Sequence, residues 1–285
     1  MSSDVSSFQQ PNLLKRVWGK SYARIAITLI LLIAISAAFA DWVAPFDPNE
    51  LDTENIFSRP SGKHYFGTDD LGRDLFSRVL HGGQIALIMA FASAAIAMIV
   101  GVVWGFIAAQ FGGWLDEILM RTVDAFLAIP IILLALILIA ALGTDIPILA
   151  LVIGLILAPA TARIARAAVL SELQLDYCSS AITLGTPRLR ILFSEVMPNT
   201  MPVLIARAVI CAADAIIIEA SLSFVGLGIN PPQASWGSLV RTGYEQLLNG
   251  YWLVLFPAIL ILIAIWCLNT LGDQILDVLD PRTES

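Results

Sequence analysis

Charged residues are scarce in this sequence of 285 residues: Asp, Glu, Lys and Arg together make up 14% of it, whereas hydrophobic residues make up 58%. Soluble domains contain about 25% charged and about 45–50% apolar residues. The chain therefore has too few polar side chains to cover a water-facing surface, and its mean hydropathy is +0.82. These values exclude a water-soluble globule, and they make the position of each charge more informative than the net charge of −7.

Cysteine and histidine are also rare. The three cysteines, Cys178, Cys211 and Cys267, lie in a predicted cytosolic loop and in two apolar segments. We interpret them as small hydrophobic residues and not as a disulfide framework. His64 and His81 have no Cys, Asp or Glu at metal-ligand spacing on an apolar segment, which argues against a membrane-embedded metalloenzyme.

A nucleotide-binding motif is lacking as well. Gly19-Lys20-Ser21 is similar to the end of a phosphate-binding loop, but Leu14 replaces the glycine that this motif requires upstream. We therefore expect no metal or cofactor to be bound by this chain.

Long uncharged segments are what the sequence does have, and each is long enough or nearly long enough to cross a bilayer. They are Ile25–Ala40, the stretch between His81 and Asp116, Ala125–Thr144, Ile146–Ala162 and the stretch between Glu245 and Asp273. Within the second of them, Gly101 and Gly105 have the small-xxx-small spacing that allows close helix contact, and the simple tolerance of glycine in membrane helices is the alternative. A further segment, 202–222, completes a prediction of six spans.

Three charged residues interrupt segment 202–222, the fifth along the chain: Arg207, Asp214 and Glu219. Charged side chains inside a span face protein or water and often mark a solute path. Arg207 and Asp214 are seven residues apart, so they share one helix face. Structural roles are the alternatives, in which Arg207 extends to the cytosolic interface and Glu219 braces the following loop.

The distribution of basic residues predicts the topology. Of the 16 Lys and Arg residues, 11 fall on the side of the N-terminus when the six spans alternate. The positive-inside rule then places both termini in the cytosol. The predicted segments are a cytosolic N-terminal segment 1–23, transmembrane helix 1 over 24–41, a periplasmic loop 42–81, a transmembrane core 82–272 with a cytosolic loop 171–198 and a periplasmic loop 223–250, and a cytosolic tail 273–285. A cleaved signal peptide ending near Ala38 and Ala40 is the alternative for the first span.

The cytosolic loop 171–198 has the pattern of two short amphipathic helices. Five residues of the first share one face: Leu170, Leu173, Tyr177, Ala181 and Leu184. Gly185 then offers the left-handed conformation that ends a helix. Thr186 is the predicted N-cap and Pro187 the first residue of the second helix, which we expect to end before Pro198.

Four motifs resemble those of bacterial ATP-binding cassette (ABC) importer permeases. The run Asp176–Gly185, with Pro198-Asn199 thirteen residues beyond its glycine, resembles the cytosolic loop of that family. The other motifs resemble the dipeptide/oligopeptide branch and are Phe66–Arg78, then Glu219–Gly228 with Pro231-Pro232 and Trp236-Gly237, and finally Gly272-Asp273 with Leu279–Arg282. Together they extend over nearly the whole chain.

The resemblance implies an all-α integral membrane protein with six transmembrane helices, the type I ABC importer permease fold, and a periplasmic loop between helices 1 and 2. It implies a transport subunit and not an enzyme, which moves dipeptides or oligopeptides from a periplasmic or extracellular solute-binding protein into the cytoplasm. The expected partners are a second permease subunit in a heterodimer, two nucleotide-binding ATPase subunits that hold ATP and Mg, the solute-binding protein, and lipid of the bacterial inner membrane, but not nucleic acid.

Other solutes and another mechanism are open alternatives. Relatives in this branch also carry nickel, glutathione or opine-like compounds. A stand-alone secondary transporter would work without ATPases, but such proteins tend to contain internal repeats, and this sequence has no convincing one.

The resemblance also implies roles for individual residues. Those expected to couple to the ATPases are Asp176, Ser179, Ser180, Ala181, Gly185, Arg188 and Arg190. Those expected in the translocation path or its gate are Asp214, Glu219, Phe224, Gly226 and Gly228. One departure concerns Ser179-Ser180-Ala181, which stands where the family usually has Glu-Ala-Ala, so Asp176 or Glu172 is the candidate for the missing carboxylate.

Overall fold

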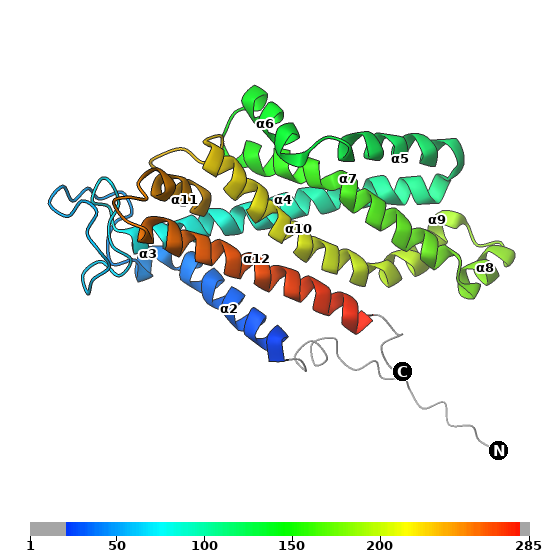
Figure 1. The fold of residues 1–285 in the computed structure, drawn as a ribbon. Coiled ribbons are helices and arrows are strands. Elements are labelled where there is room, and N and C mark those ends of the chain that lie inside the picture. Colours follow the sequence, from blue (N-terminus) through cyan, green and yellow to red (C-terminus); the bar gives the residue numbers. More distant parts are fainter. Residues whose placement is uncertain (1–20, 280–285) are drawn as a thin grey trace, which may run out of the picture.

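The computed structural model describes residues 21–279, and long helices dominate it (Figure 1). Within these residues no β-strand forms, which confirms the all-α class. The elements in chain order are α2 (Ser21–Ala38), α3 (Ala40–Val43), α4 (Leu75–Phe111), α5 (Gly113–Leu127), α6 (Ile131–Leu142), α7 (Ile146–Leu173), α8 (Asp176–Thr183), α9 (Arg188–Ile191), the π-helix η1 (Leu192–Val196), α10 (Met197–Val225), α11 (Trp236–Glu245) and α12 (Trp252–Leu279). Residues 1–20 of the predicted N-terminal segment and residues 280–285, which hold the end of the last motif and part of the predicted tail, lie outside the described residues.

Six spans are present when one bent pair is counted as a single span. Five helices are long and apolar enough to cross a membrane: α2, α4, α7, α12, and the continuous helix from Arg188 to the end of α10. α5 and α6 pass the same test together, but they are bent by 89°. The predicted third span over 125–144 is thus interrupted, since it contains the end of α5, the break and α6. Pro130, directly before α6, explains the break, because proline has no N–H and disfavours a helical conformation in the residue before it.

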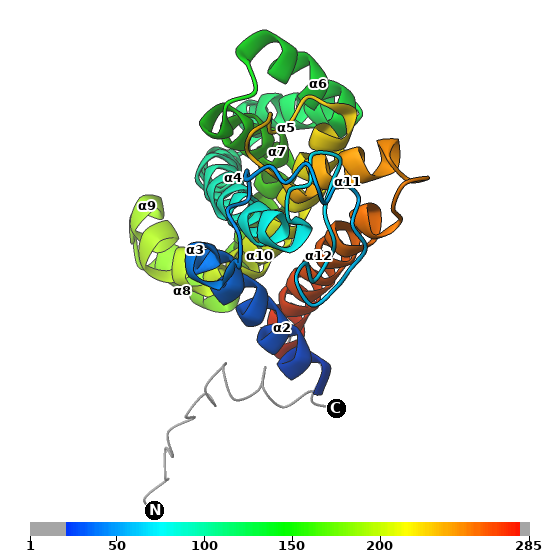
Figure 2. The ribbon, with the colours of Figure 1, turned by 90° about the vertical axis from the view of Figure 1, so that its left-hand side faces the viewer.

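The spans run side by side between two ends of the molecule. Residues 44–74 and α11 lie at one end, which we call the loop end, and α8 and α9 lie at the other, the coupling end (Figure 1). Figure 2 shows α5 and α6 on one side of α4 and α7, with α2 and α12 on the other side. The α4 helix has 37 residues and is thus about 56 Å long, so it extends beyond a hydrocarbon core of about 30 Å, as its long uncharged run suggested.

Small residues bring α4 and α7 into close contact along their length. A Cβ atom added at Gly101 would lie 2.7 Å from the Ala158 carbonyl oxygen, and one at Gly105 would lie 2.8 Å from the Arg166 backbone nitrogen. Gly154 of α7 makes the reciprocal approach to α4, since its Cβ would lie 2.6 Å from Ile96. The predicted close contact at the two α4 glycines is confirmed.

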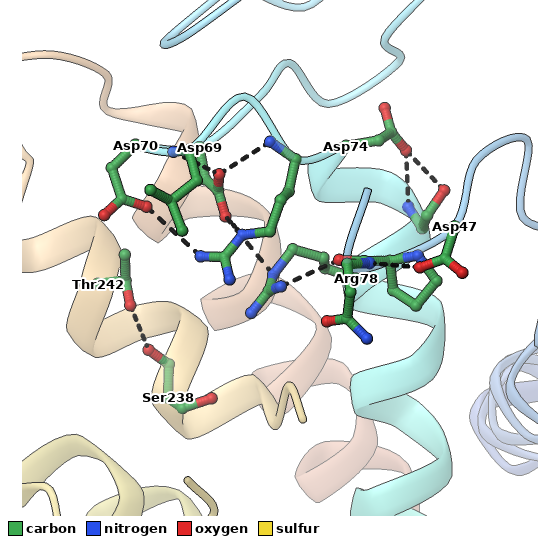
Figure 3. A network of polar contacts seen from close by, with 12 residues as sticks. Asp47, Asp69, Asp70, Asp74, Arg78, Ser238 and Thr242 are labelled. Atoms are coloured by element: carbon green, nitrogen blue, oxygen red, sulfur yellow. Dashed lines mark hydrogen bonds and ion pairs between the residues drawn. The ribbon is translucent and has the colours of Figure 1, made fainter. Parts of the chain in front are cut away.

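Buried charges hold the loop at residues 44–74 in place (Figure 3). The Asp69 carboxylate pairs with the Arg73 guanidinium at 2.7 Å, and the Arg78 Nε atom of α4 lies 3.6 Å from the same carboxylate. Asp74 caps α4 by accepting a hydrogen bond of 2.8 Å from the backbone N–H three residues on. Because buried charges are costly unless they are paired, this network fixes the loop to the start of α4. The loop is folded, and its periplasmic location stays a prediction.

Candidate functional site

At the coupling end, α8 ends at a glycine in the left-handed conformation, as predicted. Gly185 has φ = +80°, its N–H donates to the Ile182 carbonyl at 3.0 Å, and the Thr186 N–H donates to the Ala181 carbonyl at 3.1 Å. This pair of bonds is a Schellman motif. An added Cβ at Gly185 would meet no atom within 4 Å, so the backbone conformation alone requires glycine there.

The residues predicted to couple to ATPases lie mostly at the surface of this segment. Six of them are exposed: Asp176, Ser179, Ser180, Gly185, Arg188 and Arg190. The seventh, Ala181, is half-buried and packs against the apolar cluster beneath α8. Leu184 was expected on the buried face but is 85% exposed, because it lies at the turn that the Schellman motif forms.

Apolar side chains accompany these polar ones on the exposed side of the coupling end. Ile182, Leu184, Leu189 and Phe193 are all exposed. Exposed apolar side chains beside charged ones are compatible with a protein contact at this end. None of these four was among the residues predicted from sequence to couple to the ATPases.

The inner side of the coupling end is anchored to the membrane helices. Cys178, Ile191, Leu192 and Val196 are buried in one cluster with residues of α4, α7 and α10. This burial agrees with the interpretation of Cys178 as a small hydrophobic residue, and all three cysteines are buried and free.

Tyr177 ties three helices together at the coupling end. Its hydroxyl donates to Glu172 Oε1 of α7 at 2.6 Å and accepts from Asn199 Nδ2 of α10 at 3.0 Å. Burial and the hydrogen bond to Glu172 raise the pKa of Tyr177 above its usual value, so this phenol stays protonated. Since Glu172 is engaged internally, Asp176 is the better placed of the two candidate carboxylates for an external partner.

The predicted second coupling helix is wrong at both of its ends. Pro187 and not Thr186 occupies the N-cap, and it makes no side-chain capping bond. The helix does not stop before Pro198, because α9 passes through the π-helical turn η1 directly into α10. Pro198 therefore lies inside a continuous helix, directly after the π-helical turn.

In the middle of α10 an ion pair lies within the bundle. The Arg207 Nη1 atom is 3.4 Å from Asp214 Oδ2, and its Nε atom donates to Thr161 Oγ1 of α7 at 3.3 Å. The Arg207 side chain is 10% exposed and that of Asp214 is 35% exposed. The predicted shared face is thus observed. Arg207 is directed to Asp214 and Thr161, in contrast to the alternative in which it reaches the cytosolic interface.

Near the loop end, Glu219 is 1% exposed and connects to the loop after α10. Its Oε1 atom accepts a hydrogen bond of 2.6 Å from the Ser223 hydroxyl. The same hydroxyl oxygen accepts from the Ile229 N–H at 3.2 Å and from the Ser235 hydroxyl at 3.1 Å. This geometry favours the bracing role for Glu219. Sequence analysis missed Ser223, although its i+4 spacing from Glu219 placed it on the same helix face.

The loop from Gly226 to Ser235, which we call the outer loop, packs closely on its surroundings. Gly226 ends α10 in the left-handed conformation, and an added Cβ at Gly228 would overlap Ser223. Asn230 Nδ2 donates to Thr144 Oγ1, between α6 and α7, at 2.9 Å. The ring of Phe224, at the last turn of α10, meets Tyr244 of α11 edge-on with centroids 5.7 Å apart.

Comparison with known proteins agrees with this architecture. Residues 101–285 match the family described as "Binding-protein-dependent transport system inner membrane component". A putative peptide transport system permease protein of Brucella suis is 38% identical over 94% of this chain and 90% of its own length. The di/tripeptide transport system permease protein DppC of Pseudomonas aeruginosa is 34% identical over 98% of this chain and 95% of its own length.

A solved structure shares the fold. A chain of the MetNI methionine ABC transporter, in an inward-facing conformation, superposes with a TM-score of 0.61 at 19% identity, and the match covers 72% of this chain and 97% of that one. The helical bundle, the family match and the relatives lead to one assignment. The chain belongs to the family of binding-protein-dependent transport system inner membrane components, and it is a transport permease with the type I ABC importer fold.

Proposed function

We propose that this chain is a permease subunit of an ATP-driven importer that moves dipeptides or oligopeptides from a solute-binding protein into the cytoplasm. The names of its relatives, which describe peptide transport, support the substrate. In this proposal two partner ATPase subunits hold ATP and Mg, and a second permease completes a heterodimeric pore. The chain lies in a bacterial inner membrane, with both termini facing the cytosol. This chain carries out no chemical step itself.

The coupling end is the observation that carries the proposal. Its inner side is packed into the ends of α4, α7 and α10, whereas its outer side exposes polar and apolar residues together. A short element of this kind transmits the movement of an ATPase to the membrane helices, because it cannot rotate independently of them. Asp176, Arg188 and Arg190 supply charge at this contact, and Leu184 and Leu189 supply apolar area.

Purification from gently solubilised membranes tests the proposal. The tagged chain should bring with it a second permease and nucleotide-binding subunits, and the ATPase rate of the eluate should rise with the peptide-loaded binding protein. A chain that purifies alone and moves solute into liposomes without ATP would instead be a secondary transporter.

Substitutions at Gly185 sharpen this test. Proline has φ fixed near −65° and cannot adopt the observed +80°, so Gly185→Pro should preserve membrane insertion but abolish uptake. Gly185→Ala costs about 1–2 kcal/mol in the left-handed conformation and should reduce uptake only partly. Normal uptake by the proline variant would contradict the role assigned to the coupling end.

A further inference from the structure

One face of α10 is exposed and combines apolar with polar side chains. Asp214, Ile217, Ser221 and Phe224 follow one another at intervals of three, four and three residues, so they form a stripe along a single helix face. Ile217 is 41% exposed, and Asp214 and Ser221 are half-buried. We call these four residues the Asp214 stripe.

The depth of Asp214 determines what the stripe can face. Asp214 lies 11 residues before the end of α10 at Val225, which is about 16 Å along the helix. This distance is about half of a hydrocarbon core of roughly 30 Å. A carboxylate at such depth is strongly unfavourable against lipid, so the stripe faces water or protein.

Asp214 has capacity for a further hydrogen-bond donor. A carboxylate accepts about four hydrogen bonds. Among residues 21–279, Arg207 is the one donor to Asp214, at the long distance of 3.4 Å. The Arg207 side chain is itself nearly buried and held by Thr161, so it positions the carboxylate and leaves part of it open.

The second acidic residue of α10, Glu219, is not open to a further hydrogen-bond donor from outside the protein. Glu219 is fully buried, and its carboxylate is engaged by Ser223 under the outer loop. The two acids therefore separate into different roles, although they lie on one helix.

We propose that the Asp214 stripe lines the solute path and that the Asp214 carboxylate binds a cationic group of the passing solute. This inference rests on the proposed function, and the group is either the α-ammonium of a peptide or the side chain of a Lys or Arg residue in it. Arg207 acts as a positioning residue. The free energy gained is modest because the solute must also leave.

Charged thiol reagents test the stripe without any peptide. In the assembled complex, with the three native cysteines replaced, Ile217→Cys should react with both a cationic and an anionic methanethiosulfonate. The cationic reagent should react about tenfold faster, since a carboxylate one helical turn away attracts it. Adding Asp214→Asn should remove this preference.

A matched position on another helix provides the control. Leu32, in the middle of α2, is 58% exposed and has apolar neighbours, so Leu32→Cys should face lipid and react with neither reagent. No reaction at position 217, or equal rates with both reagents, would overturn the proposal. Loss of the second permease on purification of Asp214→Asn would also overturn it, because Asp214 would then be a subunit contact.

Transport of three tripeptides identifies the cationic group. Ala-Lys-Ala, Ala-Ala-Ala and Ala-Glu-Ala are compared in proteoliposomes after their affinities for the binding protein are measured. If the side chain is the ligand, Asp214→Asn slows the lysine peptide about tenfold more than the glutamate peptide. An equal loss for all three, together with a charge preference at position 217, identifies the α-ammonium. Absence of any ATP-driven peptide transport by the wild type would overturn the proposed function, whereas the reagent test would stand by itself.

Discussion

Glycines determine how closely two central helices can approach. At Gly105 an added Cβ would lie 2.8 Å from the Arg166 backbone nitrogen and 2.9 Å from Ala165 Cβ. Backbone atoms of a packed helix cannot move aside as the end of a flexible side chain can. The contact between α4 and α7 therefore depends on the absence of a side chain at this position.

Gly105→Val should destabilise the protein by about 1–3 kcal/mol or more, because overpacking forces α4 away from α7. The midpoint temperature of thermal unfolding should fall. It is measured in detergent from the loss of the monodisperse peak on heating. Gly62→Ala is the control, since an added Cβ there meets no atom within 4 Å. An unchanged midpoint for Gly105→Val would show that the helices can separate without cost.

Glu219→Ala should loosen the outer loop, because it removes the acceptor of the Ser223 hydroxyl at the point where Ile229 and Ser235 also bind. The expected cost is about 1–3 kcal/mol. Limited proteolysis should cut residues 226–235 faster than in the wild type. Glu219→Gln keeps an oxygen acceptor and should restore most of the protection; equal cleavage of wild type and Glu219→Ala would contradict the bracing role.

Spacing predicted some of these residue contacts and not others. The seven-residue interval of Arg207 and Asp214 was sufficient, because helical geometry alone brings such a pair together. The partner of Glu219 was not predicted, since a serine four residues on carries no charge that marks it as a partner; the observed donor is the Ser223 hydroxyl.

At the scale of elements, the π-helical turn η1 joins the coupling helices to α10. A π turn contains one residue more than an α-helical turn, and such turns often occur at functional positions. Its Leu192 and Val196 are buried, whereas Ser194 is exposed and donates to the Arg190 carbonyl at 2.6 Å.

Deletion of Ser194 should return η1 to α-helical pitch without changing the buried contacts of Leu192 and Val196. We expect normal insertion and assembly but at least a severalfold fall in peptide taken up per ATP hydrolysed. Ser194→Ala, which keeps the residue count and loses only the contacts of the hydroxyl with the Arg190 carbonyl and Glu195, should behave like the wild type. An unchanged ratio after the deletion would contradict a role for η1 in coupling.

Helix breaks were the least predictable elements. Pro130 and Pro198 each follow an apolar residue, yet the first breaks a span and the second lies in a continuous helix. The difference depends on tertiary position, since Pro198 directly follows a π turn that already departs from regular α-helical hydrogen bonding. Sequence pattern alone does not contain that information.

For the whole molecule, the arrangement of the two ends leads to a labelling prediction. Lys63 and Arg188 are both exposed, and they lie at the loop end and the coupling end respectively. In a background without the three buried cysteines, Lys63→Cys should react with a membrane-impermeant maleimide in intact spheroplasts, and Arg188→Cys only after permeabilisation. Reaction of Arg188→Cys in intact spheroplasts would invert the proposed topology.

The number of spans and the fold class followed from hydropathy, because a bilayer demands long apolar helices whatever their packing. The folded loop 44–74 was recognisable from its turn-forming residues. Its internal order was not, since it depends on which of many acids pair with Arg73 and Arg78.

The contact between α4 and α7 makes these two helices one rigid unit. α7 has 28 residues and is about 42 Å long. Pro159 interrupts the backbone hydrogen bonding of α7, but the neighbouring Ala158 carbonyl packs against Gly101 of α4. The contact with α4 therefore supports α7 where its own hydrogen bonding is interrupted. The C-terminal end of α7 leads into α8. Its N-terminal end lies two residues after Thr144, which binds Asn230 of the outer loop. In the proposed importer, a movement of α8 would therefore be passed along α7 to the end of that helix where Thr144 binds the outer loop.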